Sequence, residues 1–110
     1  MIEDDLASLV DRFNRHSEKN PGVREELEGL ERTISIRLKD GESYSVDLRE
    51  GRLQNLRLGA AKPANVTITT DTSTFYGLLR KEIGPMKAIV TRRLAIDGSL
   101  EDKLLFRKLL

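Results

Sequence analysis

The sequence contains no cysteine and no tryptophan, a single histidine, and no long run of apolar residues. Without cysteine, the chain can form no disulfide, no thiolate nucleophile and no cysteine-ligated zinc site. Its apolar runs extend over only a few residues, whereas a membrane-spanning helix needs roughly 20. The segment Met1 to Asp5 carries three acidic side chains and is therefore unlike a secretory signal peptide. These absences predict a cytoplasmic location.

The chain also lacks an excess of either charge, since 19 basic and 18 acidic residues give a net charge of +1. Its 110 residues, of which 38% are hydrophobic, are enough to bury a core. We therefore expect residues 1–110 to form a single domain. Residues 1–30 hold eight acids and four bases, whereas residues 71–110 hold five acids and eight bases. This asymmetry fits either an ordinary solvated surface or transient contact with an anionic membrane.

No set of residues for catalysis or metal binding is evident. His16 has neither a nucleophile partner nor metal-ligand spacing around it, and the acidic run from Glu25 to Glu28 suits a solvated helix face. The glycines are isolated at turns and do not form a phosphate-binding loop. The pairs Arg80-Lys81 and Arg92-Arg93 lack the interleaved aromatic residues of a nucleic-acid-binding groove. The sequence therefore predicts a protein that is not an enzyme and has no metal, cofactor or nucleic-acid partner.

The first part of the chain predicts two helices. Leu6, Leu9, Val10 and Phe13 follow the spacing of three and four residues that places apolar side chains on one helix face. Acidic residues at the start of this segment suit the positive end of the helix dipole. We expect Asn20-Pro21-Gly22 to end this helix. A shorter second helix would carry Val23, Leu27 and Leu30.

Three strands are predicted next, because apolar residues now alternate with polar ones. Asp40-Gly41 and Glu50-Gly51 predict tight hairpin turns, in which glycine supplies a positive φ. The alternation breaks near Gln54-Asn55, where a β-bulge would restore it. Antiparallel strands joined in this way form a meander with one apolar and one polar face. The apolar positions are Ile34, Ile36 and Leu38, then Tyr44, Val46 and Leu48, then Leu53, Leu56 and Leu58.

The second half predicts a strand, two short helices, a strand and a last helix. Asp71 or Thr72 would cap the first of these helices, Gly84 would end it, Pro85 would begin the next, and Ser99 would cap the last. The order α-α-β-β-β-β-α-α-β-α indicates an α+β fold with helices on the apolar face of a mostly antiparallel, five-stranded sheet. The apolar positions are Val66 and Ile68, then Phe75, Leu78 and Leu79, then Met86, Ile89 and Val90, then Leu94 and Ile96, then Leu100, Leu104, Leu105 and Leu109.

The apolar stripes of these helices admit two interpretations. They either fill a solid core or enclose a cavity between the helices and the sheet. Gly77 would thin the wall of its helix, at a cost of about 1 kcal/mol relative to alanine. The flexible side chain of Met86 adapts to varied apolar contacts. Both features favour a protein that binds apolar molecules.

Several motifs in the second half resemble the sterol carrier protein domain family, also called the non-specific lipid-transfer domain family. They are the strand from Ala64 to Thr70, the helix from Phe75 to Leu79, the segment Pro85-Met86-Lys87-Ala88, and the segment from Thr91 to Gly98. The resemblance implies a five-stranded sheet covered on one face by helices, with a hydrophobic tunnel between them. It also implies non-catalytic binding, and possible transfer, of a fatty acid, fatty acyl-CoA, sterol or isoprenoid-like lipid.

Carried onto this chain, the resemblance implies a set of lipid-binding residues. The tunnel floor would be formed by Ile36, Val46, Leu56 and Ile68. The walls would be formed by Phe75, Leu78, Leu79, Met86, Ile89, Val90, Leu94, Ile96, Leu100 and Leu104. A polar rim for a lipid headgroup would be formed by Arg80, Lys81, Arg92 and Arg93.

Family members often carry a further C-terminal segment that shields the tunnel, whereas this sequence stops at Leu110. We therefore expect either an open tunnel mouth or a homodimer through the last helix, in which Phe106, Leu109 and Leu110 pack against a second subunit. The alternative function is an accessory or oligomerisation module that assists an enzyme, with a filled core and no stable ligand. No cofactor is expected under either interpretation.

Overall fold

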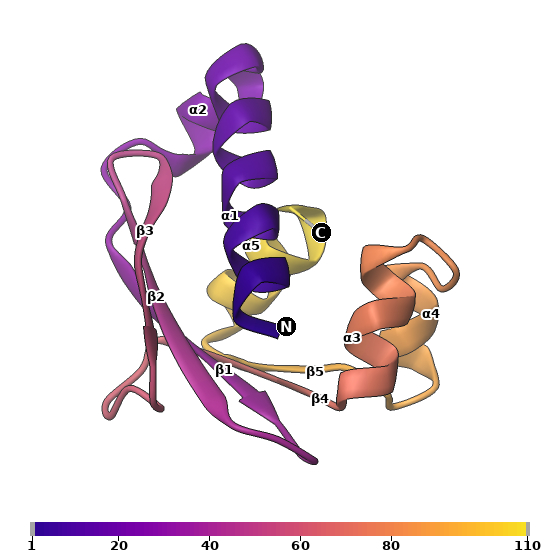
Figure 1. Cartoon of the computed structure of the whole chain (residues 1–110). Helices are drawn as coiled ribbons and strands as arrows, with labels where there is room; N and C mark the ends of the chain where they lie inside the picture. The colour runs from indigo at the N-terminus through magenta and orange to yellow at the C-terminus, as the bar shows by residue number, and fades with distance from the viewer. Residues whose placement is uncertain (1, 110) are drawn as a thin grey trace.

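The computed structural model describes residues 2–109, with side chains from residue 2 to residue 106 (Figure 1). Its helices and strands follow the predicted order, so the predicted α+β fold is confirmed. They are α1 (Ile2–Lys19), α2 (Pro21–Leu27), β1 (Arg32–Leu38), β2 (Ser43–Arg49), β3 (Arg52–Leu58), β4 (Val66–Thr70), α3 (Thr72–Leu79), α4 (Pro85–Val90), β5 (Ala95–Gly98) and α5 (Leu100–Leu109).

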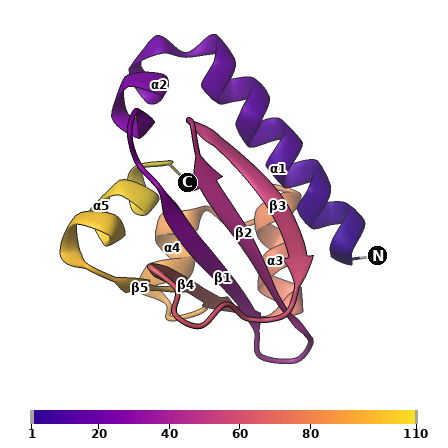
Figure 2. The same cartoon turned by 90° about the vertical axis from the view of Figure 1, so that its left-hand side faces the viewer.

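The strands form one five-stranded sheet in the order β3-β2-β1-β4-β5. Strands β1, β2 and β3 make the predicted antiparallel meander, and β5 runs antiparallel to β4. The pair β1 and β4 is parallel, with Ile34 beside Val66 and Ile36 beside Ile68. The mostly antiparallel sheet is therefore confirmed, with one parallel pair at its centre. The helices lie on one side of this sheet (Figures 1 and 2).

Alternation along the strands separates an apolar inner face from a polar outer face. Val66 is fully buried on the inner face, which the helices cover. Ser45 and Asp47 on the outer face are also buried, and each has a polar partner. The Ser45 hydroxyl donates to the Gly59 carbonyl at 2.5 Å, and the Asp47 carboxylate lies 3.3 Å from the Arg57 guanidinium. Such pairing offsets the desolvation of buried polar groups.

Two of the predicted backbone irregularities are confirmed by the φ angles. Glu50 and Gly51 have φ values of 55° and 74°, the positive angles of a two-residue hairpin turn. Asn55 has a φ of 59° where the register between β2 and β3 shifts, and this is the predicted β-bulge. The prediction for Gly41 is wrong, because this residue has no positive φ. The connection from Lys39 to Glu42 is longer than a two-residue turn, and it reverses the chain without a positive φ at Gly41.

Short polar side chains cap two of the helices on the inner face. The Asp71 carboxylate accepts a hydrogen bond from the Thr74 N–H at 2.7 Å, so Asp71 is the cap of α3. The Ser99 hydroxyl oxygen accepts from the Asp102 N–H at 3.1 Å, and Ser99 thus begins α5 as predicted. These caps satisfy backbone donors that a helix leaves without partners in its first turn.

Gly98 ends β5 where the fold leaves no room for a side chain. A Cβ atom at this position would lie 2.8 Å from the carbonyl oxygen of Asn65. The Asn65 side chain is itself held in place, because its oxygen accepts from the Thr33 N–H at 2.7 Å. The glycine that closes the segment from Thr91 to Gly98 therefore has a packing reason.

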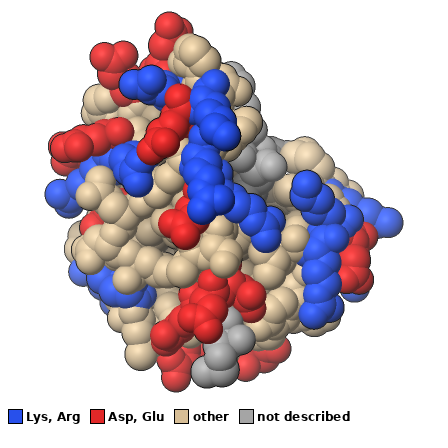
Figure 3. All heavy atoms as spheres, turned by 45° about the horizontal axis from the view of Figure 1, so that its top comes forward, with Lys and Arg blue, Asp and Glu red and all other residues tan. Residues whose placement is uncertain are grey.

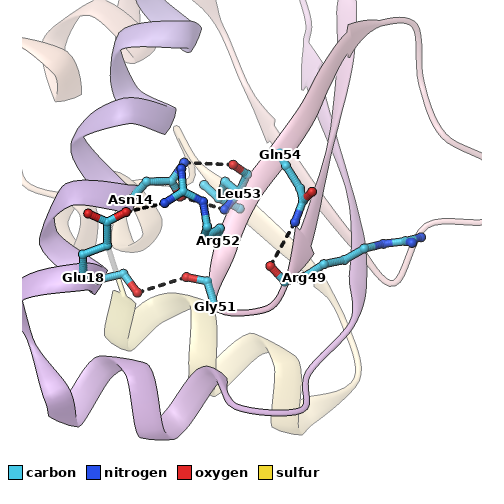
Figure 4. A network of polar contacts seen from close by, with 8 residues as sticks. Asn14, Glu18, Arg49, Gly51, Arg52, Leu53 and Gln54 are labelled. Carbon is cyan, nitrogen blue, oxygen red and sulfur yellow. Dashed lines mark hydrogen bonds and ion pairs between the residues drawn. The ribbon is translucent and has the colours of Figure 1, made fainter.

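Helix α1 is fastened to the edge strand β3 by polar side chains (Figure 4). Asn14 is 6% exposed; its Nδ2 donates to the Leu53 carbonyl at 2.9 Å, and its Oδ1 accepts from the Leu53 N–H at 2.8 Å. The Ser17 hydroxyl donates to the Gly51 carbonyl at 3.0 Å. Asn14 therefore satisfies both backbone groups that Leu53 presents at the sheet edge, where no strand is available to pair with them.

Replacing Asn14 with alanine should lower the free energy of unfolding by about 2–4 kcal/mol, because it leaves a buried backbone donor and acceptor without partners. Urea denaturation measures this loss. Gln54→Ala is the matched control, since it removes an exposed bond from Nε2 to the Arg49 carbonyl at 3.1 Å. The control should change the free energy by less than about 0.5 kcal/mol. Equal effects of the two substitutions would contradict this role of Asn14.

Candidate functional site

Three isoleucines form a row across the inner face, on the neighbouring strands β1, β4 and β5. Ile36 pairs with Ile68, and Ile68 pairs with Ile96, so their side chains leave the sheet on the same side. All three are only partly buried, although Ile36 lies within the central strand of the sheet. Ile34 and Leu38, on the same face of β1, are 2% and 3% exposed. The helices therefore cover the middle of the sheet less completely than its two ends.

The apolar core is correspondingly divided in two. The first cluster consists of Leu27, Ile34, Val46, Leu48, Val66 and Phe106. The second cluster consists of Leu6, Leu38, Tyr44 and Phe75. Among the described residues, Ile36 and Leu56 pack against both clusters, and neither residue is fully buried. We name the half-buried set Ile36, Leu56, Ile68 and Ile96 the central floor. It is the candidate site, because it is an apolar surface between two packed regions.

Helix α3 borders the central floor and is held at two points. Asp40, in the turn after β1, accepts from the Thr72 N–H and hydroxyl at 2.8 and 2.9 Å. These two bonds lower the pKa of the Asp40 carboxyl. Farther along α3, the Tyr76 hydroxyl bonds to Asp5 of α1, and this bond, together with desolvation, raises the pKa of Tyr76. Helix α3 is thus tied both to the sheet and to the first turn of α1.

Gly77 in α3 does not thin the wall of a cavity, contrary to the sequence interpretation. A Cβ at this position would lie 3.0 Å from Cγ2 of Ile83, which belongs to the connection between α3 and α4. The Gly77 carbonyl also accepts from the N–H groups of Glu82 and Ile83 at 2.8 and 3.3 Å. The glycine therefore allows the connection to fold closely against α3.

The predicted lipid-binding residues fall into three classes of burial. Val46, Phe75 and Leu94 are buried, with exposed fractions of 2%, 6% and 3%. The half-buried class consists of Ile36, Leu56, Ile68, Leu78, Leu79, Ile89 and Ile96. The exposed class consists of Met86 at 50%, Val90 at 75%, Leu100 at 73% and Leu104 at 56%. Ile36 and Leu56 share a cluster with Phe75 and Leu79, and Ile68 and Ile96 pack against the other cluster. Four predicted residues lie at the surface: Met86, Val90, Leu100 and Leu104.

Helix α5 presents a different face to the core from the one that its leucines predict. Phe106 and Asp102, one helical turn apart, are 7% and 5% exposed, whereas Leu100 and Leu104 point outward. On the buried face, Asp102 Oδ1 forms an ion pair with Arg32 Nε at the start of β1, at 2.9 Å. Phe106 belongs to the first cluster, so this chain does not present it to a second subunit as we expected. The predicted contacts of Leu109 and Leu110 lie outside the described side chains.

Two surface hollows lie away from the central floor. One, of about 590 Å³, lies between α2 and the β2–β3 turn and is lined by charged residues that include Arg24, Glu25 and Glu50. The other, of about 300 Å³, lies on the outer face of the sheet and is lined by residues that include Ser35 and Arg37. Neither hollow includes a predicted lipid-binding residue. The lining of a tunnel therefore stays a prediction.

The described residues contain no group of three or more histidine, cysteine, aspartate or glutamate side chains arranged to hold a metal ion. His16 is exposed on α1, as predicted for a surface histidine near a helix end. Over residues 2–109, no helix combines the length and the apolar character needed to cross a membrane.

Sequence reasoning missed the polar side chains that position the elements around the floor. Asn14 and Ser17 continue the spacing of three and four residues that Val10 and Phe13 begin. Two polar residues on an otherwise apolar helix face were a signal for buried hydrogen bonds. The pairing of Arg32 with Asp102 had no comparable signal, because 70 positions separate the two residues in the chain.

Single cysteines offer a direct test of the central floor, because the chain contains none of its own. Cysteine at position 36 (Ile36→Cys) should react with a maleimide faster than cysteine at position 34 (Ile34→Cys) in the folded protein. The reason is that residue 36 is partly exposed whereas Ile34 is 2% exposed. Labelling is followed by mass spectrometry, with rates in denaturant as the reference. Equal protection of the two positions would contradict an accessible floor.

Comparison with known proteins gives a family and a fold. Residues 10–110 match the SCP-2 sterol transfer family. No curated protein sequence matches the chain significantly. The solved structures that it resembles include the UbiJ-SCP2 ubiquinone synthesis protein, at 17% identity over 94% of this chain and 85% of that one, with a TM-score of 0.65. Palmitated SCP2L2 from Aedes aegypti is 15% identical over 91% of this chain and 88% of that one, with a TM-score of 0.61.

The fold also occurs within a larger protein. The sec-alkylsulfatase Pisa1 from Pseudomonas sp. is 22% identical over 79% of this chain, with a TM-score of 0.60. This chain spans only 14% of the alkylsulfatase chain. The identities show a shared fold, and the family match extends from residue 10 to residue 110. On that match, this protein belongs to the SCP-2 sterol transfer family.

Proposed function

We propose that this protein binds a lipid noncovalently on the central floor, with residues 1–110 acting as one unit. The observation that carries the proposal is the half-buried row of Ile36, Ile68 and Ile96 at the middle of the sheet. Helices α1 and α5 lie on one side of this region, and α3 and α4 on the other (Figure 1). An elongated apolar ligand would lie between them. Family membership indicates lipid binding or transfer in general.

Apolar contact supplies the driving force. Each methylene group transferred from water to an apolar surface contributes about 0.8 kcal/mol. A ligand that buries about ten methylene groups would gain roughly 8 kcal/mol, from which the loss of translational and rotational freedom must be subtracted. The result is reversible binding, which suits a carrier. Fatty acids, fatty acyl-CoA, sterols and isoprenoid-like lipids all offer such a surface, and apolar walls discriminate poorly among them. The palmitated state of the Aedes aegypti protein supports a fatty acyl chain as one ligand.

The side chains of the central floor favour binding of a ligand without catalysis. The central floor carries only aliphatic side chains. Two ionisable groups at α3, Asp40 and Tyr76, are engaged in hydrogen bonds with Thr72 and Asp5. Nucleophilic or acid–base chemistry needs a polar group within hydrogen-bonding distance of the reacting atom. We therefore propose that the protein holds its ligand and leaves it chemically unchanged.

A second candidate function is an accessory module that assists an enzyme. It is favoured by the sulfatase comparison, in which the shared fold is a small part of an enzyme chain. The exposed Leu100 and Leu104 on α5 offer a surface through which copies or partners would associate. Native mass spectrometry of the purified protein separates the two functions. A bound lipid mass supports the carrier, whereas a dimer without ligand supports the accessory module.

Saturable uptake of a fluorescent fatty acid by delipidated protein tests the carrier function. Ile68→Gln should weaken the affinity about ten-fold, because it places an amide where the ligand would bury an aliphatic side chain. Leu58→Gln is the matched control: Leu58 is 59% exposed on β3, at the opposite edge of the sheet from β5. The control should bind as the parent protein does. Absence of saturable uptake, or equal affinities of the two variants, would overturn the proposed site.

A further inference from the structure

Helices α3 and α4 end in a surface that combines exposed apolar and basic side chains. Met86 and Val90, four residues apart on α4, are 50% and 75% exposed and lie on the same helix face. Four cations are also exposed: Lys87 in α4, Arg92 and Arg93 after its end, and Lys81 in the connection from α3 to α4. We name this surface, formed by Lys81, Met86, Lys87, Val90, Arg92 and Arg93, the basic tip.

The basic tip has a local excess of positive charge. The segment from residue 80 to residue 93 contains five basic residues and one acid, Glu82. That acid lies 3.8 Å from Arg80, whose guanidinium also stacks over the Tyr76 ring at 5.4 Å. Among the described residues, the four cations of the tip form no ion pair. Figure 3 shows lysine and arginine atoms gathered over the α3–α4 side of the molecule, and acidic atoms gathered at the start of α1.

Two of these cations occupy backbone positions that favour glycine. Lys81 and Arg92 both have a φ of 62°, in the left-handed region. Each follows the end of a helix, and the two helix ends are closed by the same type of backbone hydrogen bond. At α3 the Glu82 N–H donates to the Gly77 carbonyl, and at α4 the Arg93 N–H donates to the Ala88 carbonyl, both at 2.8 Å.

Glycine is the usual residue at this position, because it lacks the Cβ that makes the conformation unfavourable. The chain thus places a strained lysine and a strained arginine at two neighbouring helix ends. The helix dipole favours a cation near a C-terminus, but it does not require that cation at the left-handed position itself. A function for the exposed charge accounts for both positions together.

We propose that the basic tip docks on an anionic lipid bilayer. Lys81, Lys87, Arg92 and Arg93 would face the headgroup phosphates, and Met86 and Val90 would enter the interfacial layer. A symmetric contact between the tips of two copies fits less well, because both tips would carry the same positive charge. The docking proposal rests on the proposed function for its purpose. Helix α3 borders the central floor, so docking would place that floor beside a lipid source. The contact itself needs no bound ligand.

Co-sedimentation with vesicles tests the docking surface. The protein should bind vesicles of phosphatidylcholine with phosphatidylserine, and not vesicles of phosphatidylcholine alone. Binding should weaken at high salt, which screens exposed charges. The double variant Lys81→Gly with Arg92→Gly should bind about 25-fold more weakly, or about five-fold for each cation, the factor that corresponds to about 1 kcal/mol. Its melting temperature should stay equal or rise, because glycine relieves two left-handed positions.

Matched controls distinguish an effect of the basic tip on vesicle binding from the effects of lower net charge or lower apolar surface elsewhere in the protein. Arg15→Gln with Lys19→Gln removes the same charge from exposed positions on α1 and should bind as the parent does. Val90→Ser should weaken vesicle binding about ten-fold, whereas Leu58→Ser at the far sheet edge should leave it unchanged. Loss of binding in the glycine variant at an unchanged melting temperature supports the proposal.

Three outcomes would overturn the docking proposal. The first is that the parent protein does not bind the phosphatidylserine vesicles, and the second is that the glycine variant binds them equally well. The third is that Val90→Ser dissolves a dimer in light scattering while vesicle binding is retained, because the tip would then be an interface between copies. Vesicle binding by a parent protein that takes up no fatty acid would support docking and overturn the proposed function alone.

Discussion

The arrangement of this fold depends on the attachment of α1 to the edge strand β3. Asn14 binds both backbone groups of Leu53, and an exposed ion pair between Glu18 and Arg52 lies beside it (Figure 4). Because α1 is fixed at this end, its remaining length crosses the inner face of the sheet. It places Val10 against the first cluster and Leu6 in the second. The half-buried central floor lies between these two clusters, so its position follows from the placement of one helix.

Much of the architecture could be predicted from local patterns. Alternation identified the strands, the spacing of apolar residues identified the helices, and Glu50-Gly51 and Asn55 marked the turn and the bulge. These features depend on residues close together in the sequence. The face of α5 could not be predicted, because leucines occupy more than one side of that helix and the buried side carries the ion pair of Asp102 with distant Arg32.

The candidate site was predictable only in part, for the same physical reason. The inner-face positions Ile36 and Ile68 follow from alternation, whereas the fraction of each side chain that the helices leave uncovered depends on tertiary placement. Leu100 and Val90 have apolar side chains that a sequence pattern assigns to a core, yet both are more than 70% exposed. Gly77 illustrates the converse, since its missing side chain makes room for Ile83 rather than for a ligand.

The proposed binding surface, the central floor, and the proposed docking surface, the basic tip, are formed by neighbouring elements. Strands β4 and β5 supply Ile68 and Ile96 of the floor, and the chain between these strands forms α3, α4 and the tip. A lipid entering from a bilayer would therefore travel a short path. Membership of the SCP-2 sterol transfer family agrees with lipid binding or transfer.

The central claim, that an acyl chain lies on the row of Ile36, Ile68 and Ile96, is tested most directly by methyl NMR of the isoleucines with palmitate added. The account predicts contacts between palmitate and the methyl groups of these three residues, with saturable shifts, and much smaller changes at Ile34, which is 2% exposed in the first cluster. Contacts confined to other parts of the protein, or shifts that do not saturate, would contradict it.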